Sequence, residues 1–236
     1  MSAAIPLAET RHTPGKPFTP QRRFWLSVEL FVLAGLVPLV VWYIHNHDVA
    51  RIRPFPILWA AMAYCLWHLL RDPTFDKRDL WRATAVPRGI RLVLLRFLIL
   101  GSALTAGVYL FMPDRFASLI RDAPHIMLII TVGYPILSVY PQGVICRVFL
   151  LHRYRQLVPR DATRIVIAIV TFSYMHLLFE NWIAIVLTLV GGTLFTLTQY
   201  RHRSLLLSSI EHSLFGILIF ASGLGDFFFS GADRSQ

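Results

Sequence analysis

Eight ionisable side chains interrupt the apolar runs of the chain, and their types allow acid–base or metal chemistry. They are Glu29, His68, Arg96, Arg147, His176, Glu180, Glu211 and His212. An ionisable group at the centre of a membrane helix costs at least about 2.5 kcal/mol, so each is a functional candidate by default. Glu29, His68 and Arg96 lie near the ends of their runs, and Arg96 is expected to extend toward the headgroups. We therefore expect structural roles for these three.

Three polar residues are expected at nearly the same depth in the membrane. Counting about 1.5 Å per helical residue from the basic end of each run places His176 about 18 Å in, His212 about 13 Å in and Gln142 about 16 Å in. This agreement indicates one buried polar site shared by three helices. The alternative is a cluster of interhelical hydrogen bonds that only holds the helices together.

His176 and Glu180 are four residues apart in the segment HLLFE. On a helix they share a face, which suits two metal ligands or a histidine oriented by a carboxylate. Alternatively, Glu180 simply lies at the headgroups. Glu211 and His212 are adjacent and point about 100° apart on a helix, so we do not expect both to face one site. Arg147 needs a partner inside the membrane, and Glu211 or Glu180 is the expected one.

The composition indicates which elements must hold these residues. Of the 236 residues, 56% are hydrophobic and only 15% are charged, whereas roughly a quarter of a soluble domain is charged. The composition predicts an integral membrane protein, and the apolar runs are too long and uniform for barrel strands. The net charge is +10, but the basic residues cluster between apolar runs. That pattern favours loops facing anionic headgroups over nucleic-acid binding.

Seven apolar runs predict an all-α, polytopic membrane helix bundle with about seven spans. The expected spans are 24–44, 56–70, 90–112, 125–151, 164–179, 182–200 and 205–220. Six spans are the alternative if the short second run is re-entrant. Basic residues gather before the first span and in alternate loops, so the positive-inside rule predicts a cytoplasmic N-terminus and an outer C-terminus.

The same runs divide the chain into four regions. Residues 1–23 are polar and contain several prolines, and they are predicted to be a disordered cytoplasmic tail. Residues 24–112 are N-terminal transmembrane helices without a recognisable motif. Residues 113–225 are the core that carries most of the candidate site residues, and residues 226–236 form a short C-terminal tail.

Three segments of the second half resemble, in order and spacing, the motifs of the CPBP family. This family comprises the type II CAAX prenyl proteases and the bacteriocin-processing intramembrane peptidases, also called Abi. The segments are YPQGVICRVFLLHRY, FSYMH and EHSLFG, and the family pattern is EExxxR, FxxxH and HxxxN. The resemblance implies that Arg147 is the motif arginine, that Phe172 and His176 form the second motif, and that His212 begins the third.

The chain departs from the family pattern at three positions. Gln142 and Gly143 stand at the two glutamate positions, and Gly216 stands where the asparagine is expected. In the family the glutamate is thought to activate a water, while the histidines and the asparagine hold a metal or an oxyanion. A glutamine takes up no proton at working pH and cannot act as a general base, although it can orient a water or a carbonyl.

The resemblance implies an intramembrane peptidase that cleaves a membrane-associated peptide or a lipidated C-terminus. The site residues expected for this activity are His176, His212, Gln142, Arg147 and Glu180. Glu180 or Glu211 would supply the missing carboxylate, and His176 and His212 would bind either the oxyanion or a metal ion, with zinc the expected metal.

The missing glutamates and asparagine motivate the alternative, a catalytically inactive relative that acts as a membrane binding, immunity or regulatory protein. A small transporter or channel is a third interpretation, which the lack of internal repeats disfavours. The expected partners are membrane lipids and a membrane peptide or protein, with no nucleic acid. The resemblance also implies a bacterial inner membrane as the location.

Overall fold

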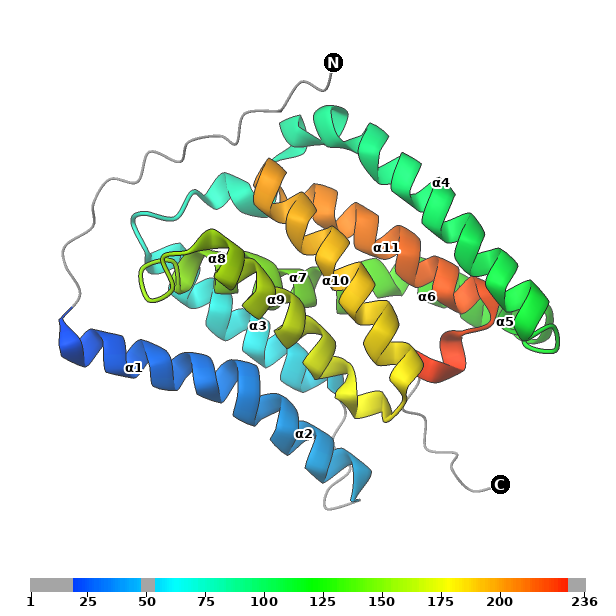
Figure 1. The fold of residues 1–236 in the computed structure, drawn as a ribbon, viewed down its shortest axis with the longest axis horizontal. Coiled ribbons are helices and arrows are strands. Elements are labelled where there is room, and N and C mark those ends of the chain that lie inside the picture. The colour runs from blue at the N-terminus through cyan, green and yellow to red at the C-terminus, as the bar shows by residue number, and fades with distance from the viewer. Residues whose placement is uncertain (1–18, 48–53, 229–236) are drawn as a thin grey trace.

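The computed structural model describes residues 19–47 and 54–228. These residues form α-helices joined by short 3-10 and π-helical turns, and they contain no strand, so the predicted all-α class is confirmed. The long helices pack side by side as a bundle (Figure 1). Large apolar side chains remain exposed on its outside, including Phe111 at 84% and Trp182 at 74%. Such side chains are expected where helices face lipid.

The helical elements follow the apolar runs of the sequence. The first half contains α1 (Pro20–Phe31), η1 (Val32–Leu36), α2 (Val37–Asn46), α3 (Pro54–Arg71), η2 (Lys77–Leu80), η3 (Ala83–Ala85) and α4 (Val86–Phe111). The second half begins with α5 (Ser118–Asp122), α6 (Pro124–Tyr134), η4 (Pro135–Val139), α7 (Tyr140–Gly143), η5 (Val144–Phe149) and α8 (Leu150–Arg153). It ends with α9 (Asp161–Met175), η6 (His176–Phe179), α10 (Trp182–His202), α11 (Leu205–Ser222) and η7 (Gly225–Phe228).

Prolines account for two of the three π-helical turns inside the long helices. Pro38 follows η1 and Pro141 follows η4, each within four residues, whereas η5 has no proline within that distance after it. A proline has no N–H to bond the preceding turn, so the local helical hydrogen bonding must change around it. The chain from α6 to α8 therefore remains one membrane-crossing helix with an altered pitch, and this helix carries Gln142 and Arg147.

Six helical stretches in the described part of the chain are long and apolar enough to cross a membrane. They are Pro20–Asn46, Ala83–Phe111, Pro124–Arg153, Asp161–Phe179, Trp182–His202 and Leu205–Ser222. Each overlaps a predicted span, but the predicted second span is not among them, so seven expected spans become six by this measure. That run is the continuous helix α3, which extends along the bundle rather than forming a re-entrant loop (Figure 1).

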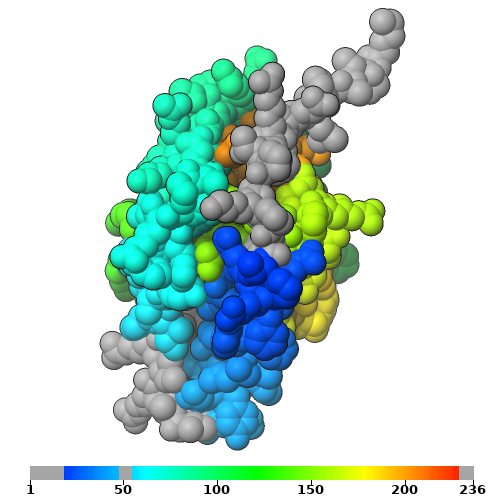
Figure 2. All heavy atoms as spheres, turned by 90° about the vertical axis from the view of Figure 1, so that its left-hand side faces the viewer, coloured from blue at the N-terminus to red at the C-terminus, as the bar shows by residue number. Residues whose placement is uncertain are grey.

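The loops predicted to share one membrane face do meet at one end of the bundle. Arg203 after α10 pairs with Asp79 of η2 at 2.9 Å. Arg153 at the end of α8 pairs with Glu29 of α1 at 2.8 Å. Figure 2 shows this side of the molecule, with α1 between the segment after α3 and the segment after α8. The alternation of the loops is thus confirmed, while the cytoplasmic assignment of this end stays a prediction.

Candidate functional site

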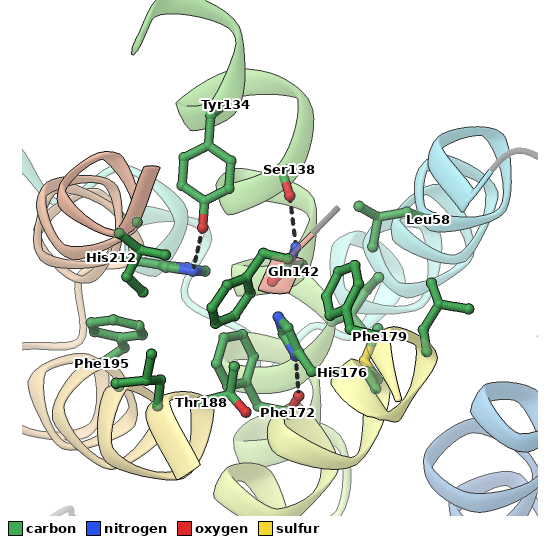
Figure 3. Close-up of a pocket in the computed structure, with 18 of the residues that line it drawn as sticks. Leu58, Tyr134, Ser138, Gln142, Phe172, His176, Phe179, Thr188, Phe195 and His212 are labelled. Atoms are coloured by element: carbon green, nitrogen blue, oxygen red, sulfur yellow. Dashed lines mark hydrogen bonds between the residues drawn. The ribbon is translucent and has the colours of Figure 1, made fainter. Parts of the chain in front are cut away.

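A cavity of about 830 Å³ lies between the helices of the bundle. This volume falls in the range of about 300–1,000 Å³ that is typical of small-ligand pockets. Its walls come from helices α2–α4 and α6–α11 and from the η segments that adjoin them, and they are mostly apolar. The polar side chains in Figure 3 include Tyr134, Ser138, Gln142, His176 and His212. The structure therefore brings together the three residues that the sequence places at one depth.

Gln142 presents an unpaired acceptor at the cavity. Its side-chain N–H donates to the Ser138 hydroxyl at 2.7 Å. Its Oε1 atom is buried and has no hydrogen-bond partner among the described residues. Because buried polar atoms are nearly always paired, this oxygen is suited to accept a hydrogen bond from a ligand or a water.

His176 lies where α9 ends, and the predicted helical pair with Glu180 does not form. The helix stops at Met175, and Glu180 follows the 3-10 turn η6 with φ at 52°. Glu180 is exposed, accepts a hydrogen bond from Trp42 Nε1 at 3.2 Å, and does not line the cavity. The prediction of a shared face was wrong because the α-helix that it assumed ends before His176.

The hydrogen bond of His176 determines which of its ring nitrogens carries the proton. Nδ1 lies 2.7 Å from the carbonyl oxygen of Phe172. A carbonyl oxygen only accepts, so Nδ1 of the neutral ring donates and Nε2 keeps its lone pair. His176 lines the cavity (Figure 3). Nε2 of His176 can therefore accept a proton or a hydrogen bond from a group in the cavity.

Arg147 pairs with neither predicted carboxylate. Its Nη1 donates to the Ser208 hydroxyl at 2.8 Å, and its Nη2 lies 3.0 Å from Nδ1 of His212. A guanidinium only donates, so Nδ1 of His212 accepts and Nε2 carries the proton. That Nε2–H donates to the hydroxyl oxygen of Tyr134, 3.1 Å away. Arg147, His212 and Tyr134 thus form one directed chain of hydrogen bonds.

Aromatic rings hold the His212 imidazole in place. Phe195 stacks on it with the ring centroids 4.5 Å apart and an interplanar angle of 21°. Phe172 meets it edge-on at 5.3 Å. The guanidinium of Arg147 lies 5.5 Å from the Phe195 centroid, within reach of a cation–π interaction. The orientation of His212 is therefore set by packing as well as by hydrogen bonds.

Glu211 lies away from the cavity and pairs with Arg96 of α4. The two charged groups are 3.0 Å apart, and the Glu211 side chain is fully buried. Arg96 Nη1 also donates to the Thr198 hydroxyl at 3.1 Å. The expectation that Arg96 extends toward the headgroups was wrong, because a buried carboxylate on α11 attracts it inward. The prediction that Glu211 and His212 face different surroundings is confirmed.

The two glycines at motif positions are surrounded by other side chains. A Cβ atom built on Gly143 would lie 2.5 Å from Cδ1 of Leu205 and 3.3 Å from Nη2 of Arg147. A Cβ atom built on Gly216 would lie 2.3 Å from Cε1 of Tyr134. The volumes that the motif glutamate and asparagine would need are therefore filled by other residues.

The cavity residues do not fit the zinc ion that the sequence suggested. The described residues contain no group of three or more His, Cys, Asp or Glu that could hold a metal, whereas protein zinc sites use three or four such ligands. Both ring nitrogens of His212 are also engaged, with Arg147 and with Tyr134.

Sequence reasoning did not single out Tyr134, Ser138 or Ser208. A usable signal exists for each of them. Tyr134, Ser138 and Gln142 recur every four residues in an apolar run, and Ser208 precedes His212 by four. Residues spaced in this way share one face of a helix. Polar residues at this spacing from a candidate site residue are therefore candidates themselves.

Residues 124–218 match the family model of type II CAAX prenyl endopeptidases described as Rce1-like. The predicted resemblance to the CPBP family is confirmed. The Rce1-like segment begins at the first residue of α6 and reaches into α11, so it contains all the polar cavity residues of Figure 3. Comparison with curated proteins and with solved structures gives no significant match. The Rce1-like segment supports a CPBP-type intramembrane protease fold in an integral membrane protein.

Proposed function

We propose that this protein binds a membrane-embedded peptide or a lipidated C-terminal segment in its cavity without cleaving it. One observation carries the proposal. No Asp or Glu of the described residues lines the cavity, and Gln142 stands there in place of the motif glutamate. The two carboxylates that the sequence offered as substitutes lie elsewhere, Glu180 beside Trp42 and Glu211 beside Arg96.

The cavity suits an amphiphilic ligand. Its apolar walls lie between membrane-crossing helices. An acyl or prenyl chain that moves from the lipid into this cavity therefore stays in contact with apolar groups and away from water. The polar groups of Gln142, His176 and Tyr134 can meet the backbone of an attached peptide. Membrane lipids are the surrounding partners in this proposal, and the bacterial inner membrane is the proposed location.

A second candidate function is slow hydrolysis with His176 as the general base. The specific observation in its favour is the Nδ1–H bond to Phe172, which leaves Nε2 unprotonated at the cavity. A neutral imidazole in this state takes a proton from water, and histidine is the commonest general base in enzymes. This candidate needs no carboxylate in the cavity.

Binding and cleavage of a lipidated peptide distinguish the two candidates. The protein would be purified in lipid nanodiscs and mixed with a fluorescent prenylated peptide, followed by anisotropy and by mass spectrometry of the peptide. Saturable binding with intact peptide, weakened in Gln142→Leu and unchanged in Glu180→Gln, supports the binding function. Glu180→Gln is the matched control because Glu180 lies outside the cavity.

Two other outcomes would count against binding alone. Cleaved peptide with the wild type that disappears with His176→Gln would establish the second candidate. Absence of saturable binding to the wild type would overturn the proposal itself.

A further inference from the structure

We propose that the hydroxyl of Tyr134 donates the hydrogen bond that binds a carbonyl oxygen of the ligand. In this role Tyr134 occupies the place of the asparagine missing at position 216. The inference rests on the proposed binding function and adds the ligand group that the site recognises. It follows from the polarity of one hydrogen-bond chain and from the packing of two residues.

The polarity of the chain begins at Arg147. Its guanidinium donates to Nδ1 of His212, which obliges the proton of the neutral ring to lie on Nε2. Nε2–H in turn donates to the Tyr134 oxygen. The tyrosine hydroxyl therefore receives a hydrogen bond from His212, and its own proton is left to donate elsewhere.

The hydroxyl proton of Tyr134 has no acceptor among the described residues. His212 is the one hydrogen-bond partner of the Tyr134 hydroxyl there, and it acts as the donor. Tyr134 lines the cavity, with its ring reaching from α6 toward α11 (Figure 3). A ligand oxygen that lies in the cavity beside His212 can complete the set of bonds. A carbonyl oxygen is the acceptor that peptides supply.

Packing explains why a tyrosine takes this place. A Cβ atom on residue 216 would lie 2.3 Å from Cε1 and 2.5 Å from the hydroxyl oxygen of Tyr134. Real Cβ atoms do not approach other atoms so closely, because the repulsion is steep. Tyr134 in this position therefore requires a glycine at 216, and an asparagine there would exclude the tyrosine ring. The two residues form a coupled pair on α6 and α11.

Tyr134 and Gln142 together select the ligand group. Tyr134 offers a donor and Gln142 offers the unpaired acceptor Oε1. A secondary amide satisfies both, since its carbonyl accepts and its N–H donates. An ester of the same shape satisfies only the donor. The site is therefore expected to favour an amide over an ester that carries the same chain.

The experiment uses two palmitoyl probes, N-methylpalmitamide and methyl palmitate. Their affinities are measured by displacement of a fluorescent lipid from the purified full-length protein in nanodiscs. For wild type, the amide is expected to bind about threefold to tenfold more tightly than the ester, the effect of one net hydrogen bond. Tyr134→Phe is expected to weaken both probes by a similar factor and to keep their ratio. Gln142→Leu is expected to abolish the preference for the amide.

Two further variants separate the hydroxyl from the fold. Tyr140→Phe is the matched control, because Tyr140 lies on the same long helix but does not line the cavity. The swap Tyr134→Ala with Gly216→Asn is expected to bind both probes more tightly than Tyr134→Ala alone, because the asparagine then supplies the donor.

The outcomes distinguish this inference from the proposed function. If Tyr134→Phe leaves both affinities unchanged while Gln142→Leu weakens the amide, the role of Tyr134 is refuted and the binding function stands. If neither probe displaces the fluorescent lipid from the wild type, both the binding function and the role of Tyr134 fail.

Discussion

Nη2 of Arg147 lies 3.0 Å from Nδ1 of His212, and this contact decides where the histidine proton lies. The arginine sits on the helix from α6 to α8 and the histidine on α11, so the contact also joins two membrane-crossing helices. The Ser208 hydroxyl accepts a hydrogen bond from Nη1 of Arg147 and donates one to the carbonyl oxygen of Phe195. The cavity is therefore polarised by a charged group that does not itself line it.

The two cavity histidines are expected to be opposite tautomers. His212 should carry its proton on Nε2 because Arg147 donates to Nδ1, and His176 should carry its proton on Nδ1 because Phe172 accepts there. Nitrogen-15 NMR of histidine-labelled protein distinguishes the two forms in one spectrum. Arg147→Leu is expected to release His212 into a mixture of tautomers and to leave His176 unchanged. Identical tautomers for both rings in the wild type would contradict this assignment.

Substitution of Gly143 is expected to destabilise the fold. A Cβ atom there meets Cδ1 of Leu205 at 2.5 Å, and overpacking of this kind typically costs about 1–3 kcal/mol. Gly143→Ala should therefore lower the free energy of unfolding, and Leu205→Val in the same chain should restore part of the loss. The measurement is equilibrium unfolding followed by tryptophan fluorescence.

Gly107 provides the control for this prediction. A Cβ atom there has no neighbouring atom within 4 Å, and alanine is favoured over glycine in a helix by up to about 1 kcal/mol. Gly107→Ala should leave stability unchanged or raise it slightly. Equal losses in the two alanine variants would show that packing against Leu205 is not the cause.

Breaking the buried pair of Arg96 and Glu211 is expected to be costly. Removing one partner leaves the other charge buried and unpaired, which typically costs about 3–5 kcal/mol. Arg96→Met should show this loss, and the double variant Arg96→Met with Glu211→Met should be closer to wild type. Arg91→Met, on an exposed position of the same helix, is the matched control. Additive losses in the double variant would mean that the two charges do not interact.

The acid stability of the loop after α3 is expected to depend on Asp72. Burial alone would raise the pKa of Asp72, but hydrogen bonds from the hydroxyl and N–H of Thr74 and from His152 lower it to about 2. In the unfolded chain the pKa is about 3.9. The ionised group therefore stabilises the fold fully above about pH 4, and this contribution is lost as the pH falls toward 2.

Unfolding of Asp72→Asn as a function of pH measures this contribution. The difference in stability from wild type should be constant at neutral pH and shrink as the pH falls below about 4. Asp122→Asn is the control, since Asp122 is exposed on α5. A stability difference between wild type and Asp72→Asn that persists unchanged at pH 2 would show that ionisation of Asp72 is not its cause.

The sequence by itself determined the helical class, the limits of most spans and the three residues that share the cavity. Hydropathy suffices for the spans because the bilayer core requires an internally bonded backbone, and a long, uniformly apolar run meets that requirement as a helix. The common depth of Gln142, His176 and His212 follows from the rise per residue of these helices. Properties that depend on one helix and the membrane were thus available from the order of residues alone.

Only the tertiary structure decided which side chains pair. Arg96 turns inward because Glu211 lies on a helix more than 100 residues further along the chain. Tyr134 and Gly216 accommodate each other across two helices, a relationship that no local spacing reveals. Local patterns indicate which residues must avoid lipid. Contacts between helices that are distant in sequence decide which group pairs with each buried charge and which side chain fills each space in the core. These contacts depend on close packing in three dimensions.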